Sequence, residues 1–155
     1  MSTYNKGGPI SSGTGRNLQR NVRPVSSVWP AGYLKNGYFD DKGNLLPAVV
    51  IDWPQQIAKM FYKDNLQTAQ LRKFFAEVRL IESQLMAGKD FNNLKPRILK
   101  LQAYAFYSNK KHNAPDVFKE FFERNIKWAS ANSKGFLEGF VHHFECVVAY
   151  FPKAN

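Results

Sequence analysis

The stretch LRKFFAEVRLIESQL, residues 71–85, decides how this chain folds. Its apolar residues recur at intervals of three and four, which is the spacing of one face of an α-helix. This apolar stripe consists of Leu71, Phe74, Phe75, Val78, Ile81 and Leu85. A second stripe consists of Arg72, Ala76, Arg79 and Ser83, with Lys73 beside it. We therefore predict an amphipathic helix that buries one face and presents a flat, positive surface on the other.

The same periodicity predicts helices on both sides of this stretch. WPQQIAKMFYKDN begins a helix with Pro54 in its first turn. Gly88 ends the 71–85 helix, and the next helix is expected to begin near Pro96 and to close at Lys110 and Lys111. Two more helices follow, DVFKEFFERNIKWA after Pro115 and GFLEGFVHHFECVVAYF with Ser133 as its cap. No segment shows convincing strand alternation, so the sequence predicts an all-α fold, a compact bundle of about five helices.

The N-terminal segment has a different composition, rich in Gly, Ser, Asn and Arg and almost free of large apolar residues. Such a stretch buries too little apolar surface to offset the entropy of ordering. We expect a flexible basic arm over residues 1–32 and a single helical domain over residues 33–155. Two interpretations of the arm stay open: it orders on a polyanion, or it is a plain tail.

The net charge of +10 arises from 22 Lys and Arg against 12 Asp and Glu. Such an excess favours a polyanionic partner, either nucleic acid or an acidic membrane surface. Nothing reads as a signal peptide, and no apolar run approaches the roughly 20 residues that a membrane span needs. The single cysteine, Cys146, excludes an internal disulfide and favours a reducing compartment, so we expect a cytoplasmic protein without a membrane partner.

Converging titratable groups, which catalysis requires, are scarce in this sequence. His142, Glu145 and Cys146 share one helical face at a spacing that metal ligands can use. No supporting ligands are evident elsewhere. The simpler interpretation packs Cys146 at the edge of the core and leaves the two histidines that we weigh, His142 and His112, on the surface. We therefore expect a protein that is not an enzyme and holds no cofactor and no metal.

The predicted helix around residues 96–112 has a basic face with interleaved aromatic residues, which is typical of nucleic-acid binding. In the alternative interpretation the tyrosines belong to the core and only the cations are exposed. No base-reading motif is recognisable, so binding would be to phosphates, independent of sequence and weakened by salt. The candidate RNA-binding residues of both helices are Arg72, Lys73, Arg79, Arg97, Lys100, Tyr104, Tyr107, Lys110 and Lys111.

Five segments together resemble a known family. In chain order they are GYFDDKGNL, WPQQIAKMF, TAQLRKFFAEV, LKPRILKLQAYA and GFLEGFVHHFECVVAYF. They resemble the small subunit of Csm-type effector complexes of type III-A CRISPR interference, over roughly residues 33 to 152. The most specific pieces are QLRKFF and FECVVAYF. Residues 1–32 are not part of this pattern.

The resemblance implies a small helical subunit without catalytic activity, whose copies stack inside a ribonucleoprotein filament beside other Csm-type subunits. There they would contact the backbone of the guide RNA and its paired target RNA, since base pairing supplies the specificity. The resemblance implies this RNA-contacting role for Arg72 and Lys73, which lie in QLRKFF, and for Arg97 and Lys100, which lie in LKPRILK. The other candidates depend on helical spacing alone. The alternatives are a purely structural scaffold subunit with incidental charge and, more remotely, a protein that lies on membrane surfaces.

Overall fold

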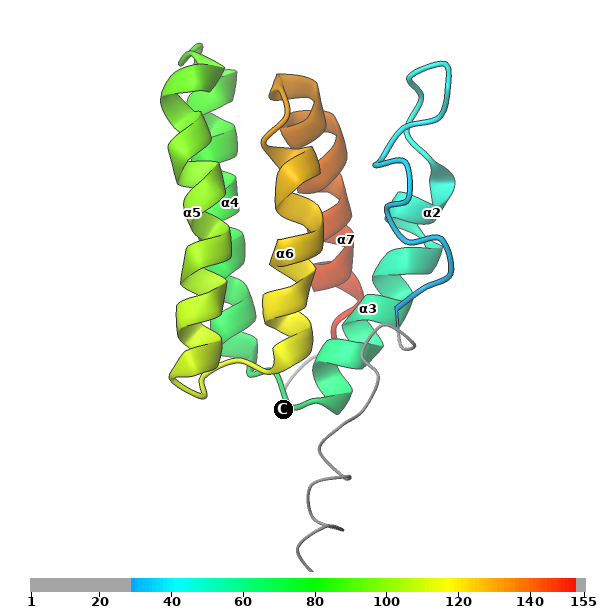
Figure 1. Ribbon diagram of the computed structural model, residues 1–155, viewed down its shortest axis with the longest axis vertical. Coiled ribbons are helices and arrows are strands. Elements are labelled where there is room, and N and C mark those ends of the chain that lie inside the picture. The colour runs from blue at the N-terminus through cyan, green and yellow to red at the C-terminus, as the bar shows by residue number, and fades with distance from the viewer. Residues whose placement is uncertain (1–28, 153–155) are drawn as a thin grey trace, which may run out of the picture.

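The computed structural model describes residues 29–152, and it is an all-α bundle, as the sequence predicts (Figure 1). Most of the predicted arm, residues 1–28, lies outside the described residues. The elements in chain order are α2 (Pro47–Val50), α3 (Asp52–Lys63), α4 (Thr68–Met86), α5 (Phe91–Lys110), α6 (Asp116–Ala129), the π-helix η2 (Gly135–Phe140) and α7 (Val141–Tyr150).

Five helical rods run alternately up and down, namely α3, α4, α5, α6 and the rod in which α7 continues directly from η2 (Figure 1). The hairpin of α4 and α5 forms one edge of the molecule, α6 and α7 lie in the middle, and α3 with α2 forms the other edge. A short turn joins α4 to α5, and Gly88 occupies it with a φ of +101°. Two backbone bonds, from Gly88 to Leu85 and from Lys89 to Gln84, close the end of α4 in a Schellman motif.

The core is built mainly from buried aromatic rings, which come from α3, α4, α6, η2 and α7. The ring centroids of Phe74 and Phe118 lie 4.9 Å apart, in an edge-to-face arrangement. Such contacts between rings stabilise a core by more than the burial of their apolar surface alone would. The fully buried rings include Phe61 of α3, Phe118, Phe121 and Phe122 of α6, Phe136 and Phe140 of η2, and Phe144 of α7. The apolar stripe predicted for residues 71–85 is confirmed as the inner face of α4, where Leu71, Phe74, Val78 and Ile81 are buried.

The loop before α2 packs against the bundle through its aromatic residues. Trp29 is buried and its ring stacks on that of Tyr33 at 5.3 Å. Gly37 and Gly43 sit at the bends with φ angles of +80° and +82°. This is the left-handed region that glycine enters without strain. Glycine at these two positions therefore lets the loop bend back on itself before α2.

The predicted start of α5 is wrong. The helix begins at Phe91, and Pro96 lies inside it rather than in its first turn. A proline at this position removes the bond to the carbonyl of Asn92. Asn92 is exposed, so that carbonyl can bond to water, while Leu94 is buried and Phe91 packs on the core. Burial of these two side chains offsets the missing hydrogen bond.

The start of the last rod also differs from the prediction. Asn132, not Ser133, supplies the cap, since its Oδ1 accepts a 2.7 Å hydrogen bond from the backbone N–H of Gly135. After one short α-helical step, the six residues Gly135–Phe140 wind as a π-helix, a form that is rare and usually short. Gly139 lies in this segment against the ring of Tyr38, and a Cβ there would meet three atoms of that side chain within 3.0 Å. Glycine at 139 therefore lets the loop and η2 approach closely.

His142 and His112 are exposed, as predicted, whereas His143, for which no position was predicted, is completely buried. Its Nδ1 donates to the carbonyl of Val49 at 2.7 Å, which leaves Nε2 to accept from the hydroxyl of Tyr33 at 2.7 Å. That hydroxyl accepts from Nδ2 of Asn125 at 2.9 Å, and Oδ1 of Asn125 accepts from the hydroxyl of Tyr38 at 2.7 Å. This chain, which we call the buried relay, satisfies each member and joins the loop, α2, α6 and α7.

Burial shifts the pKa values of the titratable members of the relay. Burial lowers the pKa of His143 to about 4 from its ordinary value of 6.5, and the hydrogen bond to Val49 opposes this only in part. Burial likewise raises the pKa of the Tyr33 and Tyr38 hydroxyls. His143 is therefore neutral at physiological pH, in the single tautomer that the relay requires.

Replacing Gly139 with alanine is expected to destabilise the fold by about 1–3 kcal/mol, because the added methyl group overpacks a site where Tyr38 is held by its hydrogen bond. Urea denaturation followed by circular dichroism measures the change. Glu138→Ala, on the exposed side of the same turn, is the control. Equal denaturation midpoints for the two variants would contradict the close approach.

Acid is expected to destabilise the protein through His143. Between pH 6.5 and about 4 the unfolded chain takes up a proton that the folded chain refuses, so stability falls as the pH is lowered across this window. A shift of this size corresponds to roughly 3 kcal/mol. The free energy of unfolding, measured across pH 4–7, should depend less steeply on pH in His143→Gln than in the wild type. His142→Gln should keep the wild-type slope, and a wild-type slope in His143→Gln would refute the assignment.

Candidate nucleic-acid interface

The positive stripe of α4 faces solvent, as its spacing predicts. Arg72, Ala76, Arg79 and Ser83 are all exposed, opposite the buried residues of the same helix. Arg72 and Lys73 are successive residues and therefore project about 100° apart around the helix. Lys73 lies on the side of α5, whereas Arg72 shares the side of Arg79, toward α7. The predicted surface is thus divided between two sides of α4.

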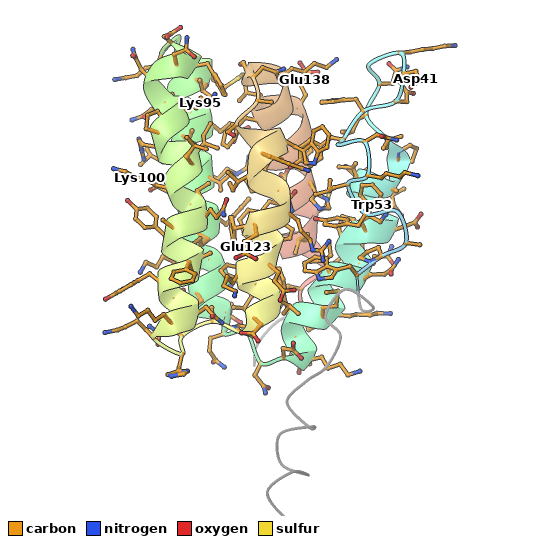
Figure 2. The ribbon with its side chains drawn as sticks, in the orientation of Figure 1. Asp41, Trp53, Lys95, Lys100, Glu123 and Glu138 are labelled. Carbon is orange, nitrogen blue, oxygen red and sulfur yellow. The ribbon has the colours of Figure 1, made fainter. Side chains whose placement is uncertain are left out.

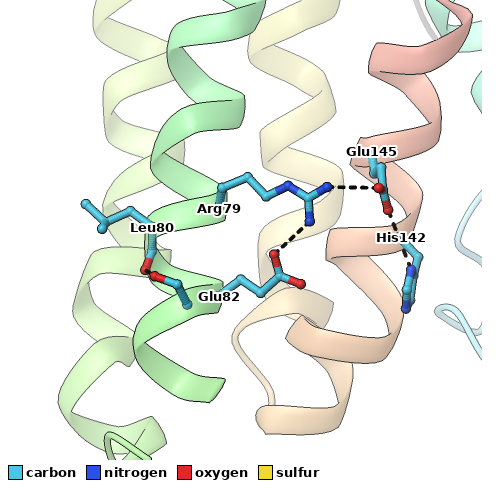
Figure 3. A network of polar contacts seen from close by, with 6 residues as sticks. Arg79, Leu80, Glu82, His142 and Glu145 are labelled. Atoms are coloured by element: carbon cyan, nitrogen blue, oxygen red, sulfur yellow. Dashed lines mark hydrogen bonds and ion pairs between the residues drawn. The ribbon is translucent and has the colours of Figure 1, made fainter. Parts of the chain in front are cut away.

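Arg79 is held by carboxylates rather than presented free (Figure 3). Its guanidinium donates to Glu82 at 2.8 Å and to Glu145 of α7 at 2.9 Å, and it lies over the ring of Phe75 at 4.9 Å. The hydrogen bond to Glu82 is the main cause of the raised pKa of Arg79. Its charge is therefore largely compensated within the fold, where it connects α4 to α7.

Arg97 is engaged in the same way between α4 and α5. Its guanidinium donates to Glu77 at 2.6 Å and to Gln84 at 2.7 Å, and only 31% of its side chain is exposed. No local pattern in the sequence points to Glu77 or Glu145 as partners, since they lie 20 and 66 positions away from the arginines that they bind. Glu82 stands three residues after Arg79, a spacing that does indicate an ion pair.

The remaining candidates on α5 are exposed. Tyr104 and Tyr107 are 50% and 58% exposed, so the alternative that places them in the core is wrong. The ammonium of Lys111 lies 5.6 Å from the centre of the Tyr107 ring. Lys100 points outward from the edge of the bundle, and Lys110 is exposed in the last turn (Figure 2).

The structure brings Lys73 of α4 together with the tyrosines of α5. Lys73, Tyr104 and Tyr107 line one hollow at the seam between these helices. Within residues 29–152, neither Lys73 nor Lys100 takes part in an ion pair, and the same holds for Arg72. We call the surface formed by Lys73, Lys100, Tyr104, Tyr107 and Lys111 the seam face. It combines uncompensated cations with exposed rings.

The possible metal site on α7 does not assemble. His142 Nδ1 lies 3.8 Å from Glu145, which is also the partner of Arg79, and Cys146 is half-buried with a raised pKa caused chiefly by burial. Across the described part of the chain, no group of three or more His, Cys, Asp or Glu side chains is arranged to hold a metal ion. None of the helices between residues 29 and 152 has the length and apolarity to cross a membrane.

Comparison with known proteins gives one match. The model of the family described as Csm2 Type III-A matches residues 47–154, which is more than half of the chain. Neither the curated proteins nor the solved structures contain a significant match. The family match covers α2 to α7 and includes the whole seam face. The chain therefore belongs to the Csm2 Type III-A family, the small subunits of the type III-A CRISPR effector complex.

Proposed function

We propose that this subunit binds the sugar-phosphate backbone of the guide RNA and target RNA inside the type III-A complex, without reading base sequence and without catalysing a reaction. The observation that carries the proposal is the seam face, where Lys73 and Lys100 have no carboxylate partner among the described residues. Uncompensated cations on a rigid helical surface suit phosphate contact and give affinity without specificity. Base pairing between guide and target would then supply the sequence recognition.

The two arginines that bind carboxylates have a different part in this proposal. An approaching phosphate would have to compete with Glu145 for Arg79 or with Glu77 for Arg97. We therefore assign the primary phosphate contacts to Arg72, Lys73, Lys100 and the lysines at the end of α5. Arg79 and Arg97 keep α4 in place against α7 and α5, and they shape the surface on which the contacts lie.

The proposal also assigns partners and place of action. The subunit would act in the cytoplasm, in antiviral defence, in contact with other Csm-type subunits and with further copies of itself. Several copies in a row would bind RNA much more tightly than one, since each bound copy raises the effective concentration of the next contact. The proposed RNA binding is therefore best measured in the assembled complex.

Replacing seam-face cations is expected to flatten the salt dependence of target-RNA binding. In complexes assembled with Lys73→Ala or Lys100→Ala, the slope of log K against log salt should fall by about one for each phosphate that a copy no longer binds. Arg79→Ala should change the slope less, because its charge is already shared by two carboxylates. Binding is measured by filter retention between low and physiological salt.

Lys59→Ala is the matched control, because this lysine is exposed on α3 at the opposite edge of the bundle. It should leave the slope unchanged. If the seam-face variants assembled normally and kept the wild-type slope, phosphate binding by this surface would be ruled out. Cleavage of RNA by the purified subunit alone would contradict the non-catalytic part of the proposal.

A purely structural role is the second candidate, and a surface on the other side of α5 favours it. Leu99 and Phe106 are half-exposed, and with Ala103 and Glu123 of α6 they line a shallow hollow of about 340 Å³. Exposed apolar side chains grouped in this way suit a protein contact. This surface and the seam face can serve a subunit contact and RNA at the same time.

The two roles are expected to separate by mutation. Leu99→Ser combined with Phe106→Ser should prevent incorporation of the subunit into the complex, because a polar side chain removes the apolar contact. The seam-face variants should be incorporated normally. Size-exclusion chromatography of the assembled complex gives the readout. The scaffold role alone would remain if seam-face variants had wild-type RNA binding in fully assembled complexes.

A further inference from the structure

The seam between α4 and α5 is hollowed into a groove of about 330 Å³. Phe74 and Leu101, both buried, form its bottom, and Tyr104 and Tyr107 stand half-exposed at its side. The groove therefore has an apolar floor and two tyrosine rings on its α5 side, and it is open to the same solvent as the seam-face cations.

Two polar groups also line this slot. The hydroxyl of Ser108 belongs to a buried residue, and the carboxylate of Glu77 is held by Arg97 at 2.6 Å. The guanidinium compensates the charge of Glu77, so the carboxylate can accept a further hydrogen bond without strongly repelling an anionic strand. At the rim, Lys73 is free of ion pairs within the described residues, and Lys111 lies against the Tyr107 ring.

We propose that this groove receives one unpaired nucleobase of an RNA strand, with its ring against the tyrosines, its exocyclic amino group on Glu77 and its phosphates on Lys73 and Lys111. The proposal deepens the RNA-backbone function and rests on it. A base within a duplex is stacked and has its edge occupied, whereas an unpaired base can be splayed out onto an aromatic surface. Cations at the rim favour this occupant over an apolar side chain of another protein.

The chemistry of the groove makes the choice of base testable. Cytosine carries an exocyclic amino group that can donate a hydrogen bond to a carboxylate, whereas uracil carries a carbonyl oxygen at that position. The two rings have the same size and stack in the same way. The groove should therefore prefer cytosine, although the phosphate contacts treat both alike.

The test uses the purified full-length chain at low salt and four hairpin RNAs of identical length. Each has one unpaired position in its stem, which carries adenosine, cytidine, uridine or an abasic sugar. Affinity is measured by fluorescence anisotropy. Adenosine is expected to bind about fivefold or more tightly than the abasic sugar, the smaller end of the range for one stacked base. Cytidine should bind more tightly than uridine.

The variants locate the effect. Tyr107→Ala and Tyr104→Ala should remove the advantage of a base over the abasic sugar, and Tyr107→Phe should keep it. Tyr62→Ala is the matched control, since Tyr62 of α3 is 57% exposed, almost as much as Tyr107. Unfolding midpoints of all variants show whether any change of affinity reflects damage to the fold.

The outcomes distinguish failure of the groove proposal from failure of the proposed RNA-backbone binding. Equal affinity for adenosine and the abasic sugar, or an equal loss for both in the tyrosine variants, would overturn the groove while the salt dependence still supported phosphate binding. Equal affinity for cytidine and uridine would overturn the assignment of Glu77. Failure of all four RNAs to bind the purified chain would also overturn the groove, whereas the salt series on the assembled complex decides phosphate binding separately.

Discussion

The fold depends most on the buried relay, in which Tyr38, Asn125, Tyr33, His143 and Val49 satisfy one another's hydrogen bonds in the core. A buried polar group without a partner costs far more than a satisfied one contributes. The loop before α2 has no regular secondary structure, so it is held by hydrogen bonds to Asn125 of α6 and His143 of α7. These two buried side chains in turn depend on the loop tyrosines for their hydrogen-bond partners. Close packing of Gly139 on Tyr38 reinforces the same junction.

The two edges of the molecule differ in how much of their surface is used for contacts within the fold. The edge formed by α2, α3 and the loop is occupied with internal contacts, such as the stacking of Trp29 on Tyr33. The α4–α5 edge is attached to the rest by apolar burial and by the ion pair of Arg79 with Glu145 of α7, whereas Arg97 joins the two helices of the edge to each other. Its outer surface is consequently free to carry uncompensated charge. A rigid attachment matters there, because phosphate contacts lose affinity when the cations are not held in position.

Much of the fold could be predicted from the sequence, because helical periodicity is a local property. The 71–85 stretch indicates both its buried face and its solvent stripe, and Gly88 marks its end. The ion-pair partners of an arginine can be distant in sequence. The pairing of Arg79 with Glu145 and of Arg97 with Glu77 is therefore evident only in the fold, where α4 meets α7 and α5. The burial of His143 was missed although a signal existed, since it follows Phe140 by three residues and precedes Val147 by four, which puts it on the inner face. The predicted start of α5 was wrong because the packing of Leu94 outweighed the usual preference of proline, here Pro96, for the first turn of a helix.

The π-helix η2 has a consequence for how the chain tolerates changes of length. A π turn arises when one extra residue is accommodated in an α-helix, and the wider turn absorbs the rotation of about 100° that this residue would otherwise add. The segment from Val141 onward therefore keeps the phase that it would have after a regular α-helix one residue shorter. Deletion of one residue between Gly135 and Phe140 would restore a regular α-helix and leave His143 facing Tyr33 and Glu145 facing Arg79. A regular α-helix with the same number of residues would instead turn both side chains away in one step, so this short segment sets the registration of the last helix with the rest of the molecule.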